Sequence, residues 1–190
     1  MDEDASTPLH EDFRRVRPVL EGELVRLRAL EEEDLPRLNE MFNDPEVLQH
    51  LDVVPFGQPL AGIREWWEAS REARDQILFA IETLPGQPIG ICGLEQIDRG
   101  ARHAWLGIWI GQPHWEQGHG TDAMRTACRF AFDQMNLQRV SLYVFDTNPR
   151  ARAVYEKVGF RHEGTLRRGR FRGGRYIDLH VLGLLAEELR

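Results

Sequence analysis

Residues 76–111 contain three apolar segments that are separated by two short turns. The segments at 76–82, 89–97 and 103–111 have the length of strands, and they are rich in Ile, Leu, Phe and Trp. The turns between them, LPGQP and DRGAR, contain the residues that tight turns prefer. Connections this short join antiparallel strands, because a parallel pair needs a long crossover. The sequence therefore predicts an antiparallel meander in the middle of the chain.

Further elements are expected on both sides of this meander. Alternating polarity predicts a strand at 22–30, and amphipathic patterns predict helices at 31–44 and 58–75. In the second helix, Ile63, Trp66 and Trp67 form the expected buried stripe. A polar stretch at residues 1–20 is interpreted as a tail or arm, which leaves one domain over residues 21–190.

The C-terminal half alternates between helices and strands. Its expected elements are a helix at 121–135, a strand at 138–145, a short helix at 148–160 that ends at Gly159, and a hairpin of 161–168 with 175–185 across a GRFRGG turn. Together the patterns predict an α/β (α+β) chain whose sheet is mixed but mostly antiparallel, with about seven strands and about four helices.

Charge is divided unevenly along the chain, whose net charge is −7. Residues 1–100 hold 10 basic and 22 acidic side chains, whereas residues 101–190 hold 14 basic and 9 acidic ones. A polyanionic ligand would favour the second half and a cationic ligand the first. The alternative is a patchy surface charge without function.

Several classes of protein are disfavoured. No apolar run is long enough to span a membrane, and the acidic start of the chain does not resemble a signal peptide. Cys92 and Cys128 fit neither a disulfide framework nor a zinc site, and the scattered histidines lack ligand spacing. We therefore expect a cytoplasmic protein without a metal, and with neither a membrane nor a nucleic acid as its partner.

Two glycines, Gly118 and Gly120, precede the helix expected at 121–135. A glycine-lined turn into a helix points bare N–H groups and the positive end of the helix dipole at an anion, which suits a phosphate. The simpler alternative is a tight turn that needs positive φ.

The same glycines also match the dinucleotide fingerprint G-x-G-x-x-A, which runs from Gly118 to Ala123. However, QPHWEQ separates them from the preceding strand, and hairpins rather than βαβ units lie upstream. The acidic ribose contact of that fingerprint is also misplaced, because Asp146 comes too late. A nicotinamide-dependent oxidoreductase is therefore a minor alternative.

Three longer segments resemble one family. They are WLGIWI with HWEQGHGTDAM, then YVFDTNPRARAVYEKVGF, and finally EGTLRRGRFRGGRYIDLHVLGLL. Together they resemble the GNAT-superfamily N-acetyltransferases, in particular the RimJ/RimL-like branch of ribosomal-protein and spermidine acetyltransferases. The resemblance covers roughly residues 20–186 and implies a sheet that splays between its fourth and fifth strands.

The resemblance also implies acetyl-CoA as co-substrate, lying in the V-shaped gap between those two strands. The backbone of Ile108, Trp109 and Ile110 would bond the pantetheine amides. The diphosphate would lie on the backbone N–H groups of a loop formed by Trp115, Glu116, Gln117, Gly118, His119, Gly120 and Thr121. Trp115 stands where the wider superfamily often has Gln or Arg.

Two residues of the next helix complete the implied site. Asn148, followed by Pro149, is a good helix start on sequence grounds, and in the family this asparagine also lies near the pantetheine. Tyr155, seven residues on, would protonate the departing thiolate; the alternative is an aromatic core residue.

The general base is less defined. Relatives often carry a glutamate on the fourth strand, two residues before its glycine, where this chain has Trp105. Glu95 is our candidate in its place, with His103 as a second, although a residue such as Glu95 is more often just an exposed strand carboxylate.

These expectations describe an acetyl-CoA-dependent transferase that acetylates a primary amine by direct attack. The acceptor is expected to be a small molecule or a peptide: a protein N-terminus, a polyamine or an amino-sugar antibiotic. Trp66 and Trp67 are candidates to line its site. An alternative of a different class is a CoA-binding sensor that has lost catalysis. Because many relatives dimerise, a homodimer is left open.

Overall fold

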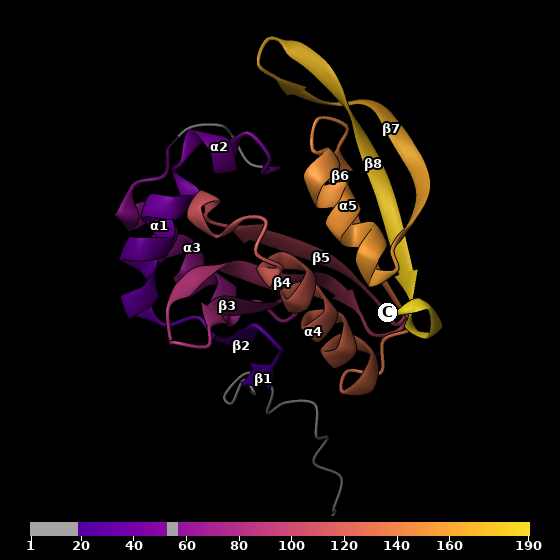
Figure 1. Ribbon diagram of the computed structural model, residues 1–190, viewed down its shortest axis with the longest axis horizontal. Coiled ribbons are helices and arrows are strands. Elements are labelled where there is room, and N and C mark those ends of the chain that lie inside the picture. The colour runs from indigo at the N-terminus through magenta and orange to yellow at the C-terminus, as the bar shows by residue number, and fades with distance from the viewer. Residues whose placement is uncertain (1–18, 53–56) are drawn as a thin grey trace, which may run out of the picture.

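The computed structural model describes residues 19–52 and 57–190, and it contains one eight-stranded sheet (Figure 1). The strands lie in the order β1-β2-β3-β4-β5-β6-β8-β7. Their bounds are β1 Leu20–Glu21, β2 Val25–Ala29, β3 Ile77–Thr83, β4 Pro88–Asp98, β5 His103–Ile110, β6 Arg139–Phe145, β7 Arg161–Arg172 and β8 Arg175–Leu185. Only the β5–β6 pair is parallel among the described strands, which confirms the mixed, mostly antiparallel sheet. The strand β1, which we did not predict, adds to the expected number.

Five α-helices connect these strands. They are α1 Leu35–Phe42, α2 Pro45–Leu48, α3 Leu60–Glu72, α4 His119–Asp133 and α5 Pro149–Val158. Of these, α2 was not predicted, since the pattern at 31–44 gave one helix and no further element. None of the described helices is long and apolar enough to cross a membrane. The tail predicted for residues 1–20 lies outside the described residues except for its last two, and Leu20 already belongs to β1.

The helices pack on opposite faces of the sheet. One face packs against α4 and α5, where Phe79 of β3 contacts Phe130 of α4 edge to face. The other packs against α1 and α3, where Trp67 is buried and donates its indole N–H to the Leu30 carbonyl oxygen at 3.1 Å. Ile63 is buried as predicted, but Trp66 is 41% exposed, so its place in the buried stripe was wrong. Adjacent residues on a helix point about 100° apart, and only one of the two indoles can face the core.

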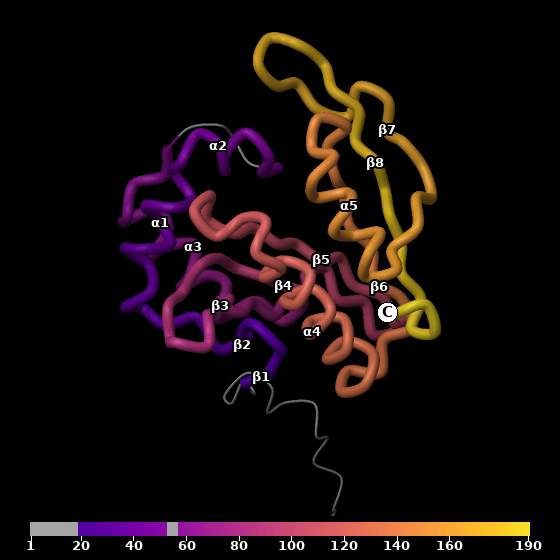
Figure 2. The backbone as a smooth tube through the Cα atoms, viewed as in Figure 1, coloured from indigo at the N-terminus to yellow at the C-terminus, as the bar shows by residue number. Residues whose placement is uncertain are grey.

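The sheet opens between β5 and β6. The two strands pair only through three neighbouring positions, from His103 with Arg139 to Trp105 with Ser141. Beyond Trp105 they diverge, and β7 and β8 rise away from β3–β5 with β6 beside them (Figure 2). This confirms the predicted splay, which leaves the second half of β5 with an edge that no described strand covers.

The closing hairpin is longer than predicted. β7 continues through the segment that we assigned to a turn, and the reversal occurs at Gly173 and Gly174, whose φ values are +54° and +79°. The register shifts between Leu166 and Arg170, and Arg168 in between has φ +56°. This bulge breaks the alternation of side chains, which is why the sequence pattern suggested an early turn.

One buried carboxylate joins α4 to the far edge of the sheet. Asp122, in the first turn of α4, accepts hydrogen bonds from the backbone N–H groups of Glu23, Leu24 and Val25 at 3.1, 2.8 and 3.0 Å. Asp122 is only 5% exposed, so its carboxylate depends on these amides for its solvation. The glycine turn that precedes α4 is thereby held against the start of β2.

Candidate active site

Two cavities meet where β5 and β6 diverge. The first, of about 400 Å³, lies between β5, the residues 114–121 that lead into α4, and α5; we call it the loop cavity. The second, of about 730 Å³, lies on the α1–α3 face of the sheet; we call it the sheet cavity. Both are lined by His50, Leu51, Ile108, Trp109, Asn148 and Tyr155. The opening in the sheet therefore connects its two faces.

The loop cavity brings together most of the residues expected to bind a coenzyme. Those that line it are Ile108, Trp109, Ile110, Trp115, Glu116, Gly118, Gly120, Thr121 and Asn148. Gln117 and His119 do not, and the Gln117 amide instead donates to the Pro113 carbonyl oxygen at 2.8 Å. Gly118 has φ +85° and is the cap of α4, so the turn needs positive φ and also precedes a helix N-terminus. The glycine turn therefore combines the two proposed roles, a tight turn that needs positive φ and an entry into a helix N-terminus that can face an anion.

The backbone of β5 presents alternate residues to this cavity. The Gly111 N–H donates to Ile89 of β4 at 2.8 Å, and hydrogen-bonding direction alternates along a strand. Ile108 and Ile110 therefore turn their backbone groups toward the gap, whereas Trp109 turns its own toward β4. Trp109 can reach a ligand there only through its side chain.

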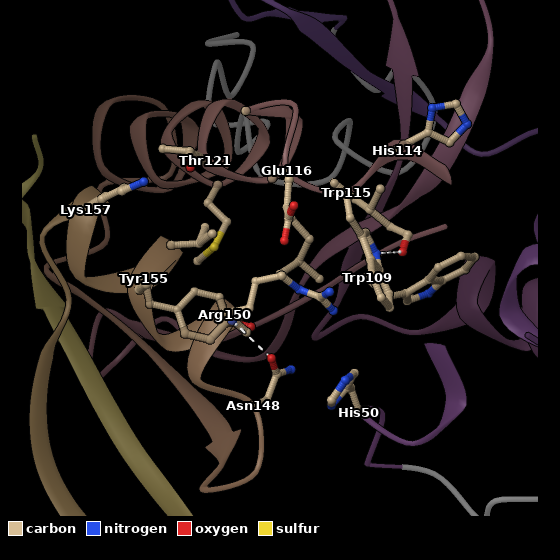
Figure 3. A pocket seen from close by; sticks show the side chains of 18 of the residues that line it. His50, Trp109, His114, Trp115, Glu116, Thr121, Asn148, Arg150, Tyr155 and Lys157 are labelled. Carbon is tan, nitrogen blue, oxygen red and sulfur yellow. Dashed lines mark hydrogen bonds between the residues drawn. The ribbon is translucent and has the colours of Figure 1, made fainter. Parts of the chain in front are cut away.

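A cation–aromatic stack lies inside the loop cavity (Figure 3). The Trp115 indole donates its N–H to the Ile110 carbonyl oxygen at 2.6 Å, and the Arg150 Cζ lies 3.4 Å from the Trp115 ring centroid. His50 faces the same ring, and its pKa lies below the usual range because of burial and the positive charge of Arg150. Our sequence analysis missed Arg150 and His50. Arg150 could have been found from its place in the first turn of α5, two residues after Asn148.

Asn148 and Tyr155 are both held by α5. The Asn148 Oδ1 accepts the Ala151 N–H at 3.0 Å, which confirms the predicted helix cap. Tyr155 is 8% exposed and lies where the two cavities meet. Burial, with a smaller effect of Cys92, raises the pKa of its hydroxyl well above the usual range. Tyr155 therefore stays protonated at neutral pH.

The sheet cavity contains Glu95 at its floor. Glu95 is opposite Trp105 in the β4–β5 ladder, and its Oε1 lies 3.7 Å from where a Cβ on Gly107 would be. Glu95 is exposed, as the alternative interpretation of this strand residue expected, and its side chain lines the cavity. Partial desolvation by neighbouring residues still raises the pKa of the carboxyl above its usual range, and the charge of Asp75 adds to this. Such a carboxylate is a better proton acceptor near neutral pH than an ordinary one.

The second candidate base is placed less favourably. His103 does not line either cavity, and its Nε2 is 3.0 Å from the Ser141 Oγ. Its pKa is lowered by burial and by the charge of Arg139. Within residues 19–52 and 57–190, no group of three or more His, Cys, Asp or Glu side chains could hold a metal ion.

Comparison with known proteins gives consistent matches over most of the chain. A family model described as an acetyltransferase (GNAT) domain matches residues 25–161. An uncharacterized N-acetyltransferase, p20 of Bacillus licheniformis, is 29% identical and covers 87% of this chain and 95% of its own length. The crystal structure of spermidine N-acetyltransferase from Vibrio cholerae with CoA and spermine has a TM-score of 0.81 at 27% identity, covering 87% and 97% of the two chains. Mycobacterium smegmatis RimJ with CoA-disulfide has a TM-score of 0.78 at 26% identity, covering 87% and 83%.

Proposed function

The chain belongs to the GNAT family of acetyltransferases, and we propose that it transfers an acetyl group from acetyl-CoA to a primary amine at the junction of its two cavities. The observation that carries this proposal is the position of Tyr155, a buried and protonated hydroxyl that lines both cavities. The thioester would enter from the loop cavity and the amine from the sheet cavity, so that they meet inside the opening between β5 and β6.

The loop cavity has features that fit acetyl-CoA. The Ile108 backbone groups and the Ile110 N–H face the gap and suit the amides of a pantetheine arm, as an added strand would, while the Ile110 carbonyl oxygen accepts the Trp115 indole N–H. The Gly118 turn exposes N–H groups at the start of α4, where an anionic diphosphate is favoured. Arg150 supplies a positive charge in the same cavity. These features fit a ligand that is anionic at one end and carries amide groups along its length.

Proton removal from the acceptor is proposed for Glu95. An alkylamine has a pKa of about 10.4, so most of it is a non-nucleophilic ammonium at neutral pH. The Glu95 carboxylate, on the floor of the sheet cavity, would take this proton directly or through a water molecule. Its raised pKa supports that role.

Proton return is proposed for Tyr155. Acetyl-CoA supplies the acetyl carbonyl and a thiolate leaving group. As the N–C bond forms and the C–S bond breaks, the amine gives up two protons in all. The thiolate takes its proton from Tyr155, the Tyr155 oxygen recovers one of the two amine protons, and the other amine proton passes from Glu95 to solvent. The Ile108 N–H, which faces the gap, would stabilise negative charge on the carbonyl oxygen.

Direct attack is favoured over a covalent enzyme intermediate. Cys92 and Cys128 are buried, and burial, with a smaller effect of the Glu95 charge, raises the pKa of the Cys92 thiol to about 12. Burial also raises the pKa of Cys128. A nucleophilic cysteine needs an accessible thiolate, and neither residue provides one.

The test has two stages. Calorimetry should show acetyl-CoA binding with a dissociation constant below millimolar, and release of free thiol should then depend on an added primary amine. Absence of binding at millimolar coenzyme would contradict the proposal. Binding without thiol release, over peptide N-termini, polyamines, arylalkylamines and aminoglycosides, would favour the sensor that has lost catalysis.

Two further expectations remain proposals. The protein would act in the cytoplasm, a location that its buried, unpaired cysteines fit. No nucleic acid partner is expected, and the homodimer is left open; light scattering of the purified chain distinguishes a monomer from a dimer.

A further inference from the structure

The sheet cavity is lined mostly by aromatic and aliphatic side chains. Its aromatic members come from α1, α3, β5, β6 and α5: they are Phe42, Trp66, Trp105, Trp109, Tyr143, Phe145 and Tyr155. Trp66 is 41% exposed and Tyr143 is 42% exposed, although aromatic side chains are usually covered. A ligand with an apolar group of matching size would bury this lining away from water, which is energetically favourable.

Charge in this cavity is sparse. Among the described residues that line it, the carboxylates are Asp52 and Glu95. Both oxygens of Asp52 accept hydrogen bonds from the guanidinium of Arg170 on β7. Asp75 lies near Glu95 but does not line the cavity. Glu95 is therefore the one lining carboxylate of the described chain that remains available to an ammonium.

Glu95 lies between a stacked pair of aromatic rings and a small space that no side chain fills. Trp105, opposite Glu95 on the neighbouring strand, stacks on Tyr143 with ring centroids 4.2 Å apart and planes 10° apart. Gly107 of β5, which pairs with Gly93 of β4, leaves space beside the carboxylate, because only the Glu95 Oε1 lies within 4 Å of an added Cβ there; at Gly93 the Leu78 side chain fills the corresponding space. An ammonium at Glu95 would thus be within reach of an aromatic face, with a shallow space beside it.

We propose that the acceptor is a primary amine with a single positive charge on an aromatic or similarly flat apolar body, and not a polyamine. This inference rests on the proposed function and narrows it. Glu95 pairs with one ammonium, and the aromatic lining covers the rest of the molecule. A second ammonium would lie among aromatic and aliphatic side chains without a free carboxylate, and burying an unpaired charge is costly.

The direct experiment compares amines at saturating acetyl-CoA, with thiol release as the readout. Tryptamine and 2-phenylethylamine should each have a kcat/KM at least about tenfold above that of spermidine. Trp105→Glu, which adds a second carboxylate, should shift the spermidine-to-tryptamine ratio at least about tenfold toward spermidine.

A second variant tests the same inference without changing Trp105, whose substitution could disturb folding. Gly107→Leu should fill the space beside Glu95, since only the Glu95 Oε1 lies within 4 Å of the added Cβ. The KM for tryptamine should rise about tenfold, while acetyl-CoA binding by calorimetry should not change. Phe171→Ala is the control, because Phe171 is 61% exposed near the end of the hairpin and lines neither cavity.

The outcomes separate this inference from the proposed function. If acetyl-CoA does not bind the wild-type chain, the proposed function fails. If it binds, and spermidine is acetylated as well as or better than both aromatic amines, the inference is overturned and the proposed function stands. Absence of turnover with both aromatic amines, beside turnover of another amine, overturns it as well.

Discussion

The loop cavity and the sheet cavity adjoin each other but are built in different ways. The loop cavity draws mainly on two short stretches, 108–124 and 148–157, and offers backbone groups together with the charged side chains of Glu116, Arg150 and Lys157. The sheet cavity takes side chains from α1 to β8, and its chemistry depends on which side chains happen to meet. Recognition by backbone is local in sequence and tolerates drift in side chains, whereas recognition by side chains can change with single substitutions. The first cavity therefore suits a constant ligand and the second a variable one.

Tyr155 belongs to both cavities, so its hydroxyl offers the strongest test of their junction. Tyr155→Phe should lower kcat by about a hundredfold, since it removes the proton donor to the thiolate and little else. The KM values for acetyl-CoA and for the amine should change little, as steady-state kinetics can show. Tyr176→Phe, an exposed tyrosine on β8, is the matched control. An unchanged kcat would remove Tyr155 from the chemistry.

Gly118→Val should damage the loop cavity alone. The substitution puts a β-branched residue at φ +85°, which strains the turn, and a Cβ 3.0 Å from the Leu24 Cδ1, which the Leu24 side chain has to yield to. We expect the dissociation constant of acetyl-CoA to rise roughly thirtyfold, equivalent to about 2 kcal/mol.

Gly86→Val provides the comparison for this variant. Gly86 has φ +94° in the β3–β4 turn, with nothing within 4 Å of an added Cβ. It should reduce stability by a similar backbone effect but leave coenzyme binding intact in calorimetry. Equal losses of binding in both variants would mean that the effect at Gly118 is one of stability.

Glu95→Gln should affect only the sheet cavity. The carboxylate accepts a proton only when ionised, so kcat/KM should fall as pH drops through its pKa, which lies above the usual carboxyl range. The variant should lose this acidic limb and about tenfold of kcat/KM at pH 7. Acetyl-CoA binding should be unaffected. A pH profile that keeps the limb in the variant would assign proton removal to another group.

Arg150→Gln should have the smallest effect and should again act on the loop cavity. Loss of the positive charge beside Trp115 should weaken acetyl-CoA binding about three- to fivefold at low salt, and less at high salt because ions screen it. Arg152→Gln is the control, because Arg152 lies two residues on in α5 and pairs with Glu156. If both variants respond alike, general charge and not the loop cavity is responsible.

The sequence predicts the backbone features of the loop cavity better than it predicts the side-chain contacts of either cavity. The glycines at 118 and 120 and the cap at Asn148 were accessible because each depends on local backbone chemistry, whereas the splay was predicted only through the resemblance to a known family. Arg150 and His50 were missed, since their role depends on tertiary contacts with the Trp115 ring, which their own sequence neighbourhoods do not reveal. The exposure of Trp66 was also missed, because helix periodicity identifies an apolar stripe but not a hollow beside it.

The hydrogen bonds from the start of β2 to Asp122 have a consequence for dynamics. The start of β2 and the turn before α4 are coupled, since a movement of either one breaks the hydrogen bonds between the Asp122 carboxylate and the backbone of residues 23–25. We expect the amide hydrogens of residues 23–25 to exchange more slowly with solvent when coenzyme is bound at the turn before α4, although these residues lie about a hundred positions earlier in the chain. The edge strand would serve as a built-in reporter of occupancy.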